Sequence, residues 1–125
     1  MKKIINTTNA PAPIGPYSQA VLVDNTLYVS GQIPLNPKTN ELVMTDIKAE
    51  TKMVMENLKA ILNEAEMDFS HVVKCSIFIS NMNDFAQINE VYGSYFSSNF
   101  PARETVQVAC LPKNVNVEIS AIAVK

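Results

Sequence analysis

Glu118 is the residue of this chain whose context most clearly suggests chemistry. Its segment, residues 115–124, alternates as a β-strand does, and one face is wholly apolar: Val115, Val117, Ile119, Ala121 and Ala123. Glu118 lies on the opposite face. Two interpretations follow from the pattern, an exposed strand glutamate or a partly buried carboxylate that acts as a base or holds a water molecule.

Arg103 is a second candidate, because it follows Phe100-Pro101-Ala102 and opens an expected strand. A guanidinium group there can bind a carboxylate through two parallel hydrogen bonds. The alternative is a surface arginine in an ordinary ion pair. The remaining polar residues in apolar or turn contexts are weaker candidates: Tyr17, Ser30, Asn89, Thr105 and Gln107.

Several kinds of active site are excluded by the residue inventory. The single histidine, His71, is far in sequence from the two cysteines, Cys75 and Cys110, so neither a Ser-His-Asp nor a Cys-His arrangement is expected. No glycine-rich phosphate loop is present, and no group of ligands has the spacing of a metal site. We therefore expect no metal and no cofactor.

Length and composition indicate one packed domain spanning residues 1–125. The chain is 47% hydrophobic and 18% charged, with 3 Gly, which excludes a disordered or low-complexity chain. The net charge of 10 − 12 = −2 disfavours nucleic-acid binding. No apolar run is long enough to cross a membrane, and no secretory signal is evident, so a cytoplasmic protein with reduced thiols is predicted.

The first part of the chain is predicted to form short strands around an irregular segment. A strand is expected near residues 3–6, followed by a proline-rich extended connection over residues 6–16. Residues 20–23 and 26–30 flank Asp24-Asn25 and indicate a hairpin, with Leu27 and Val29 on one face. Residues 31–40 are predicted to be a loop.

Two amphipathic helices follow. The first is capped by Thr45 or Asp46, and its apolar face recurs at helical spacing: Ile47, Thr51, Val54, Leu58, Ile61, Leu62 and Ala65. The second is expected over about residues 83–97 after an asparagine cap, with a stripe of larger side chains: Phe85, Ile88, Tyr92, Tyr95 and Phe96. These aromatic side chains are predicted to belong to the core.

Three further strands complete an α+β fold with a mixed sheet and two helices on one face. They are expected at residues 71–80, 104–111 and 115–124, and the first is predicted to have apolar residues on both faces, with Val73 on the Cys75 side and Val72 opposite. An apolar sheet face without helices must be covered, and a closed oligomer is the economical cover.

Four segments together resemble the Rid (YjgF) family, and within it the RidA group. They cover nearly the whole chain: IGPYSQAV at 14–21, SGQIPLNPKTNEL at 30–42, NDFAQINEVYGSYF at 83–96 and FPARETVQVACLPKNVNVEISAIAV at 100–124. The resemblance implies a chorismate-mutase-like fold and a homotrimer with a central β-barrel and clefts between subunits. It also implies deamination of the reactive 2-imino acids 2-iminobutanoate and 2-iminopropanoate.

The resemblance also implies roles for individual residues. Arg103 matches the arginine that holds the substrate carboxylate, and Glu118 matches a glutamate implicated in hydrolysis. Other matches line the cleft as substrate-binding residues: Tyr17, Ser30, Gly31 and Asn89. Thr105 stands where many relatives have cysteine, and its hydroxyl can still donate a hydrogen bond to a bound oxygen.

Spacing bears on whether Arg103 and Glu118 can meet. If the last two strands formed a hairpin about Pro112-Lys113-Asn114, Glu118 would face Val108, and Arg103 would lie roughly 16 Å further along the strand. That separation is too large for one small substrate. Either the last strand pairs elsewhere in the sheet, or the two residues meet across a subunit boundary.

Three functions follow from these observations, of which an enzyme is the first. In it, Arg103 pairs with the substrate carboxylate and Glu118 positions water against C2 of the imine, giving a 2-oxo acid and ammonia. The second is a non-catalytic, trimeric 2-oxo-acid-binding or regulatory protein that needs Arg103 but not Glu118. The third is an endoribonuclease, which the acidic composition disfavours.

Overall fold

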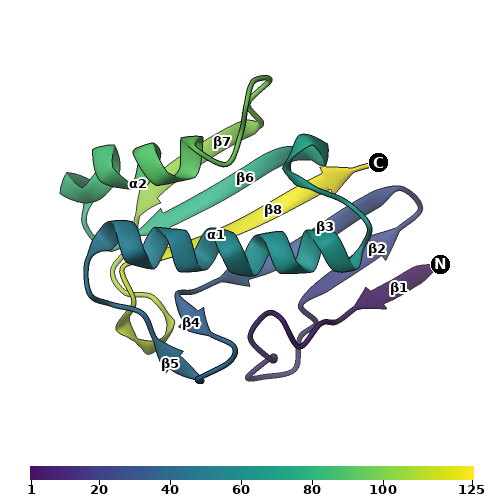
Figure 1. Ribbon diagram of the computed structural model, residues 1–125, viewed down its shortest axis with the longest axis horizontal. Coiled ribbons are helices and arrows are strands. Elements are labelled where there is room, and N and C mark those ends of the chain that lie inside the picture. The colour runs from purple at the N-terminus through teal and green to yellow at the C-terminus, as the bar shows by residue number, and fades with distance from the viewer.

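A six-stranded mixed sheet with two helices on one face forms the frame of the protein, as the computed structural model of residues 1–125 shows (Figure 1). The strand order is β1-β2-β3-β8-β6-β7, and every neighbouring pair is antiparallel except β6 and β7. The elements are β1 (Lys2–Ile5), β2 (Ala20–Val23), β3 (Thr26–Gln32), α1 (Ile47–Glu64), β6 (Val72–Ile79), α2 (Phe85–Gly93), β7 (Ala102–Gln107) and β8 (Val117–Val124). The predicted α+β class is confirmed.

Helix α1 begins at the predicted cap. The Asp46 carboxylate accepts a hydrogen bond from the Ala49 N–H at 2.8 Å, which satisfies one of the free donors of the first turn. Its apolar face packs on the sheet and is fully buried at Val54, Met55, Leu58, Ile61 and Leu62. Burial of this stripe, more than helix propensity, stabilises the helix.

The second helix is shorter than predicted. A 3-10 turn, η2 (Met82–Asp84), precedes α2, and the helix ends at Gly93 rather than near residue 97. Tyr95 and Phe96 leave the helix and pack on Phe69, with ring centroids 5.3 and 5.4 Å from that of the Phe69 ring. Tyr95 and Phe96 therefore match the spacing of the apolar stripe because they are packed against Phe69, although they lie beyond the end of the helix.

Strand β8 lies at the centre of the sheet and alternates as predicted. Val117, Ile119 and Ala123 are fully buried beneath the helices, whereas Glu118 and Ser120 point to the face without helices. The start of the strand is fixed by the buried Glu50 of α1. Its carboxylate accepts hydrogen bonds from the backbone N–H and the side-chain amide of Asn116, at 3.1 and 2.8 Å.

The hairpin assumed for the last two strands is wrong. Strand β7 pairs only with β6, in parallel, and β8 lies between β3 and β6, so β6 separates β7 from β8. Helix α2 makes the crossover that a parallel pair requires. Strand β7 also ends at Gln107 rather than at 111, because Gln107 lies opposite Ile79, the last residue of its one partner strand. The turn before β8 is the 3-10 turn η3 (Pro112–Asn114), where Lys113 and Asn114 have φ of 57° and 56°.

Two smaller predictions are corrected by irregularities in the strands. Strand β3 continues through Gln32, and the expected loop contains β4 (Leu35–Asn36), which pairs with β5 (Glu41–Leu42) directly after the loop. In β6 the register shifts between Val72 and Lys74. This bulge turns Val72 into the core and leaves Val73 47% exposed, the reverse of the predicted faces.

The face of the sheet opposite the helices carries exposed apolar side chains. Tyr28 and Ile4 are each 50% exposed, and Val106 and Val124 are each 41% exposed. Tyr28 alternates along β3 with the buried Leu27, so it points away from the helices. No element of this chain covers the face. Neither helix combines the length and hydropathy that a transmembrane span requires.

Candidate active site

Arg103 lies on the helix side of edge strand β7, next to α2. It pairs in register with Cys75, whose side chain is buried beneath the helices. Its Nη1 donates a hydrogen bond to Asn89 Oδ1 at 2.6 Å. Arg103 is the one arginine of the chain, and none of the ion pairs in the structure includes it. Its positive charge is therefore free to bind an anion.

Glu104, the next residue, points to the other face of the sheet. Its carboxylate accepts a hydrogen bond from the Ser76 hydroxyl and pairs with Lys74 Nζ at 3.1 Å. The hydrogen bond from Ser76 and the neighbouring Lys74 hold the pKa of Glu104 below its ordinary value. This carboxylate is consequently ionised and engaged away from Arg103.

Glu118 is half-buried on the helix-free face and makes no hydrogen bond or ion pair within the chain. It lies opposite Phe78 of the neighbouring strand β6. Burial raises the pKa of Glu118 above the ordinary carboxyl value, because the ionised form loses water that no protein donor replaces. Of the two interpretations of its sequence pattern, the partly buried carboxylate is the one that the structure favours.

Gly31 leaves space for the Glu118 side chain. It lies within the irregular end of β3, between Val29 and Gln32. A Cβ atom at position 31 would overlap the Glu118 carboxylate and would lie 2.8 Å from its Cδ. The glycine is therefore required by the close approach of the carboxylate.

If Glu118 is the general base that the resemblance implies, replacing Gly31 by alanine is expected to displace its carboxylate and to lower turnover of a 2-imino acid at least tenfold. The melting temperature should change little, since the carboxylate is the end of a flexible side chain. Kinetics and thermal melts of Gly31→Ala beside the wild type test this expectation. Wild-type turnover in Gly31→Ala would contradict it.

Ser30 and Tyr17 each make a hydrogen bond at the end of the proline-rich segment. The Ser30 hydroxyl donates to the Ser18 carbonyl at 2.6 Å, and the Tyr17 hydroxyl accepts from the Ile14 N–H at 3.3 Å. Sequence reasoning missed the anchor of this segment, Gln19, which is 2% exposed. Its side-chain amide bonds the backbone of Thr7, Ala10 and Pro11, so it holds the segment in place without regular structure.

Thr105 lies on the same face of β7 as Arg103, two positions further along. Its hydroxyl is buried and has no hydrogen-bond partner in the chain. An unpaired buried hydroxyl is costly unless a ligand or water satisfies it. A role for Thr105 in substrate binding stays a prediction.

One chain cannot bring Arg103 and Glu118 to the same small molecule. Glu118 and Val106 both lie opposite Phe78, on the strands that flank β6, and Arg103 is three residues before Val106. Two strand spacings and three residues place the Cα atoms of Arg103 and Glu118 about 14 Å apart. The two side chains also point to opposite faces of the sheet. The candidate site therefore has two halves, Arg103 with Asn89 and Glu118 with Gly31.

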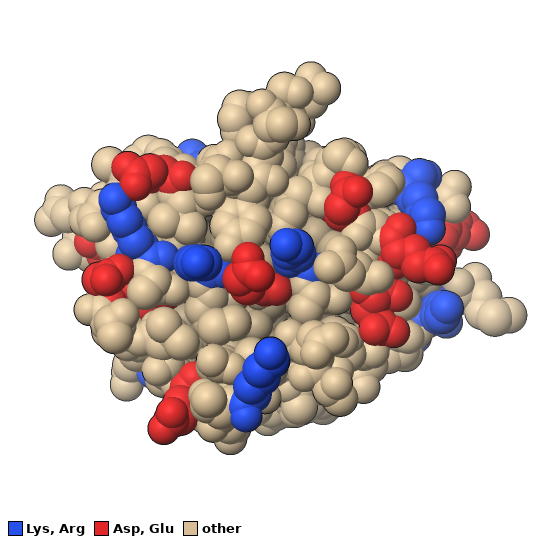
Figure 2. Space-filling model, viewed as in Figure 1, with Lys and Arg blue, Asp and Glu red and all other residues tan.

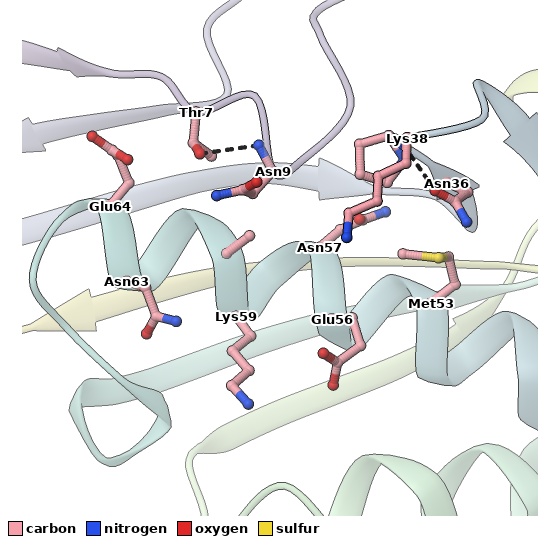
Figure 3. A pocket seen from close by; sticks show the side chains of 12 residues that line it. Thr7, Asn9, Asn36, Lys38, Met53, Glu56, Asn57, Lys59, Asn63 and Glu64 are labelled. Carbon is pink, nitrogen blue, oxygen red and sulfur yellow. Dashed lines mark hydrogen bonds between the residues drawn. The ribbon is translucent and has the colours of Figure 1, made fainter.

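Arg103 borders a cavity of about 520 Å³ lined by Asn89, Tyr92, Gly93, Phe100, Pro101 and Arg103. A slightly larger groove of about 550 Å³ lies elsewhere, between α1 and the segments that contain Thr7 and Lys38 (Figure 3). Its buried Asn57 donates to the carbonyls of Ile33 and Leu35, which ties α1 to the start of β4. None of the predicted site residues lines this groove.

Comparison with known proteins identifies the family to which this two-layer fold belongs. A family model described as endoribonuclease L-PSP matches residues 7–125. A RutC family protein from Pyrococcus horikoshii is 53% identical over 125 residues, covering 100% of this chain and 99% of the relative. A 2-iminobutanoate/2-iminopropanoate deaminase from Bos taurus is 50% identical over 125 residues, covering 100% of this chain and 91% of the relative.

The crystal structure of RidA from an Antarctic Psychrobacter species has the same fold. It matches with a TM-score of 0.95 at 45% identity and covers 98% of this chain and 99% of that protein. The chain belongs to the Rid (YjgF) family and its RidA group, as the sequence motifs predicted. Relatives of similar identity carry different names, deaminase and RutC among them, so membership of the family alone does not specify a substrate.

Proposed function

We propose that this protein hydrolyses small 2-imino acids, 2-iminobutanoate and 2-iminopropanoate, to 2-oxo acids and ammonia in clefts between subunits. One observation carries the proposal: the unpaired guanidinium of Arg103 and the unpaired, half-buried carboxylate of Glu118 lie on opposite faces of one sheet. A second copy of the chain is needed to place both groups around one ligand. The relatives named as deaminases support the choice of substrate.

The assembly we propose is a homotrimer around a central β-barrel. The helix-free face supports it, because Tyr28, Val106 and Ile4 are exposed there and would be buried by the sheets of neighbouring copies. A closed ring with threefold symmetry buries the same surface on each subunit and leaves no apolar face open. Each boundary between subunits would then hold one Arg103 and one Glu118.

In this site Arg103 binds the substrate carboxylate through its free N–H groups and fixes the position of C2. Glu118 accepts a proton from water as the water oxygen bonds to C2 and the imine π electrons move to nitrogen. The tetrahedral product carries a hydroxyl and an amino group on C2. The nitrogen takes one proton from solvent as this amino group forms, and protonated Glu118 then returns its proton to the same nitrogen. The C–N bond breaks and ammonia leaves as the C=O bond forms, and the hydroxyl proton is released to solvent.

The environment of each group suits its proposed step. Desolvation makes the Glu118 carboxylate a better proton acceptor than a solvated glutamate, because its pKa is raised. The charge of Arg103 is not cancelled by an internal partner. Orientation and one proton-transfer group are enough to accelerate a hydrolysis that already proceeds in water.

An RNA-cleaving activity, suggested by the family description, has less support. On the helix-bearing face, Lys and Arg side chains alternate with Asp and Glu and form no continuous positive surface (Figure 2). The single histidine is engaged in a turn, where its Nδ1 accepts the Asp68 N–H at 3.0 Å. Without a basic surface, contacts with a phosphate backbone are weak.

The proposal is tested by generating 2-iminobutanoate with a threonine dehydratase and trapping it with semicarbazide. We expect added wild-type protein to lower the yield of trapped imine in proportion to its concentration. If the protein leaves the yield unchanged but binds 2-oxobutanoate, the non-catalytic ligand-binding alternative replaces the proposal.

A further inference from the structure

Helix α2 holds the Arg103 side chain through groups that carry no charge. The Arg103 Cζ lies 5.5 Å from the centroid of the Phe85 ring and 5.2 Å from that of Tyr92. Between them in sequence, Asn89 Oδ1 accepts the one hydrogen bond that the guanidinium makes, at 2.6 Å. Phe85, Asn89 and Tyr92 are spaced four and three residues apart, so they share one face of the helix.

None of the carboxylates nearest in sequence to this group pairs with Arg103. Asp84, which precedes Phe85, makes no ion pair at all. Glu90, which follows Asn89, pairs with Lys48 Nζ at 2.6 Å. Glu104, which follows Arg103, pairs with Lys74 on the opposite face of the sheet. No carboxylate of the chain therefore pairs with the guanidinium, although three acidic residues flank the group in sequence.

Tyr92 also stays neutral. Its hydroxyl is buried and has no hydrogen-bond partner. Burial, and then the neighbouring Cys75 thiol, raise the pKa of Tyr92 well above its ordinary value, so a phenolate does not form near neutral pH. The aromatic face beside Arg103 is consequently that of a phenol.

The choice of neutral partners has a physical consequence. A carboxylate would hold the guanidinium firmly but would cancel its charge, and a ligand anion would have to displace or compete with it. Ring faces and an amide oxygen attract the same cation through a quadrupole and a dipole and leave its net charge intact. They also limit the rotamers of a long side chain, which lowers the entropy lost when a ligand binds.

We propose that Phe85 and Tyr92, together with Asn89, form a neutral clamp that positions Arg103 and preserves its charge for a ligand carboxylate. Phe85 and Tyr92 are positioning residues in this scheme and act on the ligand through Arg103. The identity of the ligand, a small 2-imino or 2-oxo acid, rests on the proposed function. The geometry of the clamp is independent of that proposed function.

The charge argument is tested by comparing Asn89→Asp with Asn89→Ala. The aspartate side chain is nearly isosteric with asparagine and would strengthen the bond to Arg103 while cancelling its charge, whereas truncation to alanine removes the bond and leaves the charge. We expect the Kd for 2-oxobutanoate, measured by calorimetry, to rise about tenfold or more in Asn89→Asp and about threefold in Asn89→Ala. The melting temperature of Asn89→Asp should be at least that of Asn89→Ala.

The ring argument is tested at Phe85, where Phe85→Leu keeps the apolar volume but removes the aromatic face and Phe85→Tyr keeps the face. We expect the Kd for 2-oxobutanoate to be about threefold higher in Phe85→Leu than in the wild type, and to equal the wild-type value in Phe85→Tyr. Thermal melts confirm that each variant is folded.

Two results would overturn the clamp: tighter binding by Asn89→Asp than by Asn89→Ala, or equal binding by Phe85→Leu and Phe85→Tyr. These measurements use binding alone and involve no imine chemistry. A protein that binds 2-oxobutanoate in the expected order but fails to clear imine would retain the clamp and lose the proposed hydrolysis. A protein that clears imine without the expected order would lose only the clamp.

Discussion

Replacing Arg103 by alanine is expected to lower kcat/KM for imine clearance by about a hundredfold or more, because the variant loses both charge-assisted hydrogen bonds to the substrate carboxylate. No other arginine can substitute for it, since Arg103 is the one arginine of the chain. The semicarbazide assay with enzymatically generated 2-iminobutanoate measures the effect directly.

Arg103→Lys is the matched control for this prediction. It keeps the positive charge but not the planar fork, so its kcat/KM should fall between those of the wild type and Arg103→Ala. Thermal melts should show small changes for both variants, because Arg103 is exposed on an edge strand. Clearance by Arg103→Ala at the wild-type rate would remove the guanidinium from the site.

Replacing Glu118 by glutamine is expected to lower kcat by about 10²- to 10⁴-fold, because the amide cannot accept the proton of the attacking water. In the wild type, kcat should fall as the pH is lowered through the pKa of Glu118, which burial places above the ordinary carboxyl value. A pH profile of wild-type clearance between about pH 4 and 8 tests the second statement.

The pH dependence of stability is expected to be opposite to that of kcat, because protonation of Glu118 lowers kcat but favours the folded state. A carboxyl group whose pKa is raised by folding favours the folded state at low pH, and this stabilisation is lost as the pH rises through the folded-state pKa. Glu118→Gln removes the desolvated charge, so its melting temperature should equal or exceed that of the wild type at pH 7. The difference should vanish near pH 4. A marked loss of stability at pH 7 would indicate that Glu118 has a structural role instead.

Local patterns in the sequence predicted the elements that depend on burial. The stripe of α1 and the alternation of β8 were both confirmed, because one face of each is almost wholly buried. The register shift at Val73 and the end of α2 were not predictable, since they depend on a bulge and on contacts with Phe69.

The positions of β7 and β8 in the sheet show a second limit of prediction from the sequence. Pro112-Lys113-Asn114 reads as a hairpin turn, but β6, which comes much earlier in the chain, lies between the two strands. That choice is decided by long-range strand pairing rather than by the turn. The candidate residues were identified, yet their division between two faces of the sheet became visible only with this topology.

The proposed role of α2 in positioning Arg103 could not be predicted from the apolar pattern of the helix. Phe85 and Tyr92 fit the apolar stripe of a helix, and Tyr92 is indeed buried. The available signal was Asn89, a polar residue at the same helical spacing as these aromatic side chains. Only the position of Arg103 beside them distinguishes a clamp from an ordinary core face.

The central claim is that each site combines Arg103 of one copy with Glu118 of another. It is tested most directly by unfolding and refolding together equal amounts of Arg103→Ala and Glu118→Gln, each inactive alone, and measuring imine clearance. In a randomly assorted trimer, about a quarter of the boundaries would pair an intact Arg103 with an intact Glu118, so about a quarter of wild-type activity should return. A mixture that assembles but stays as inactive as its two components would contradict the account.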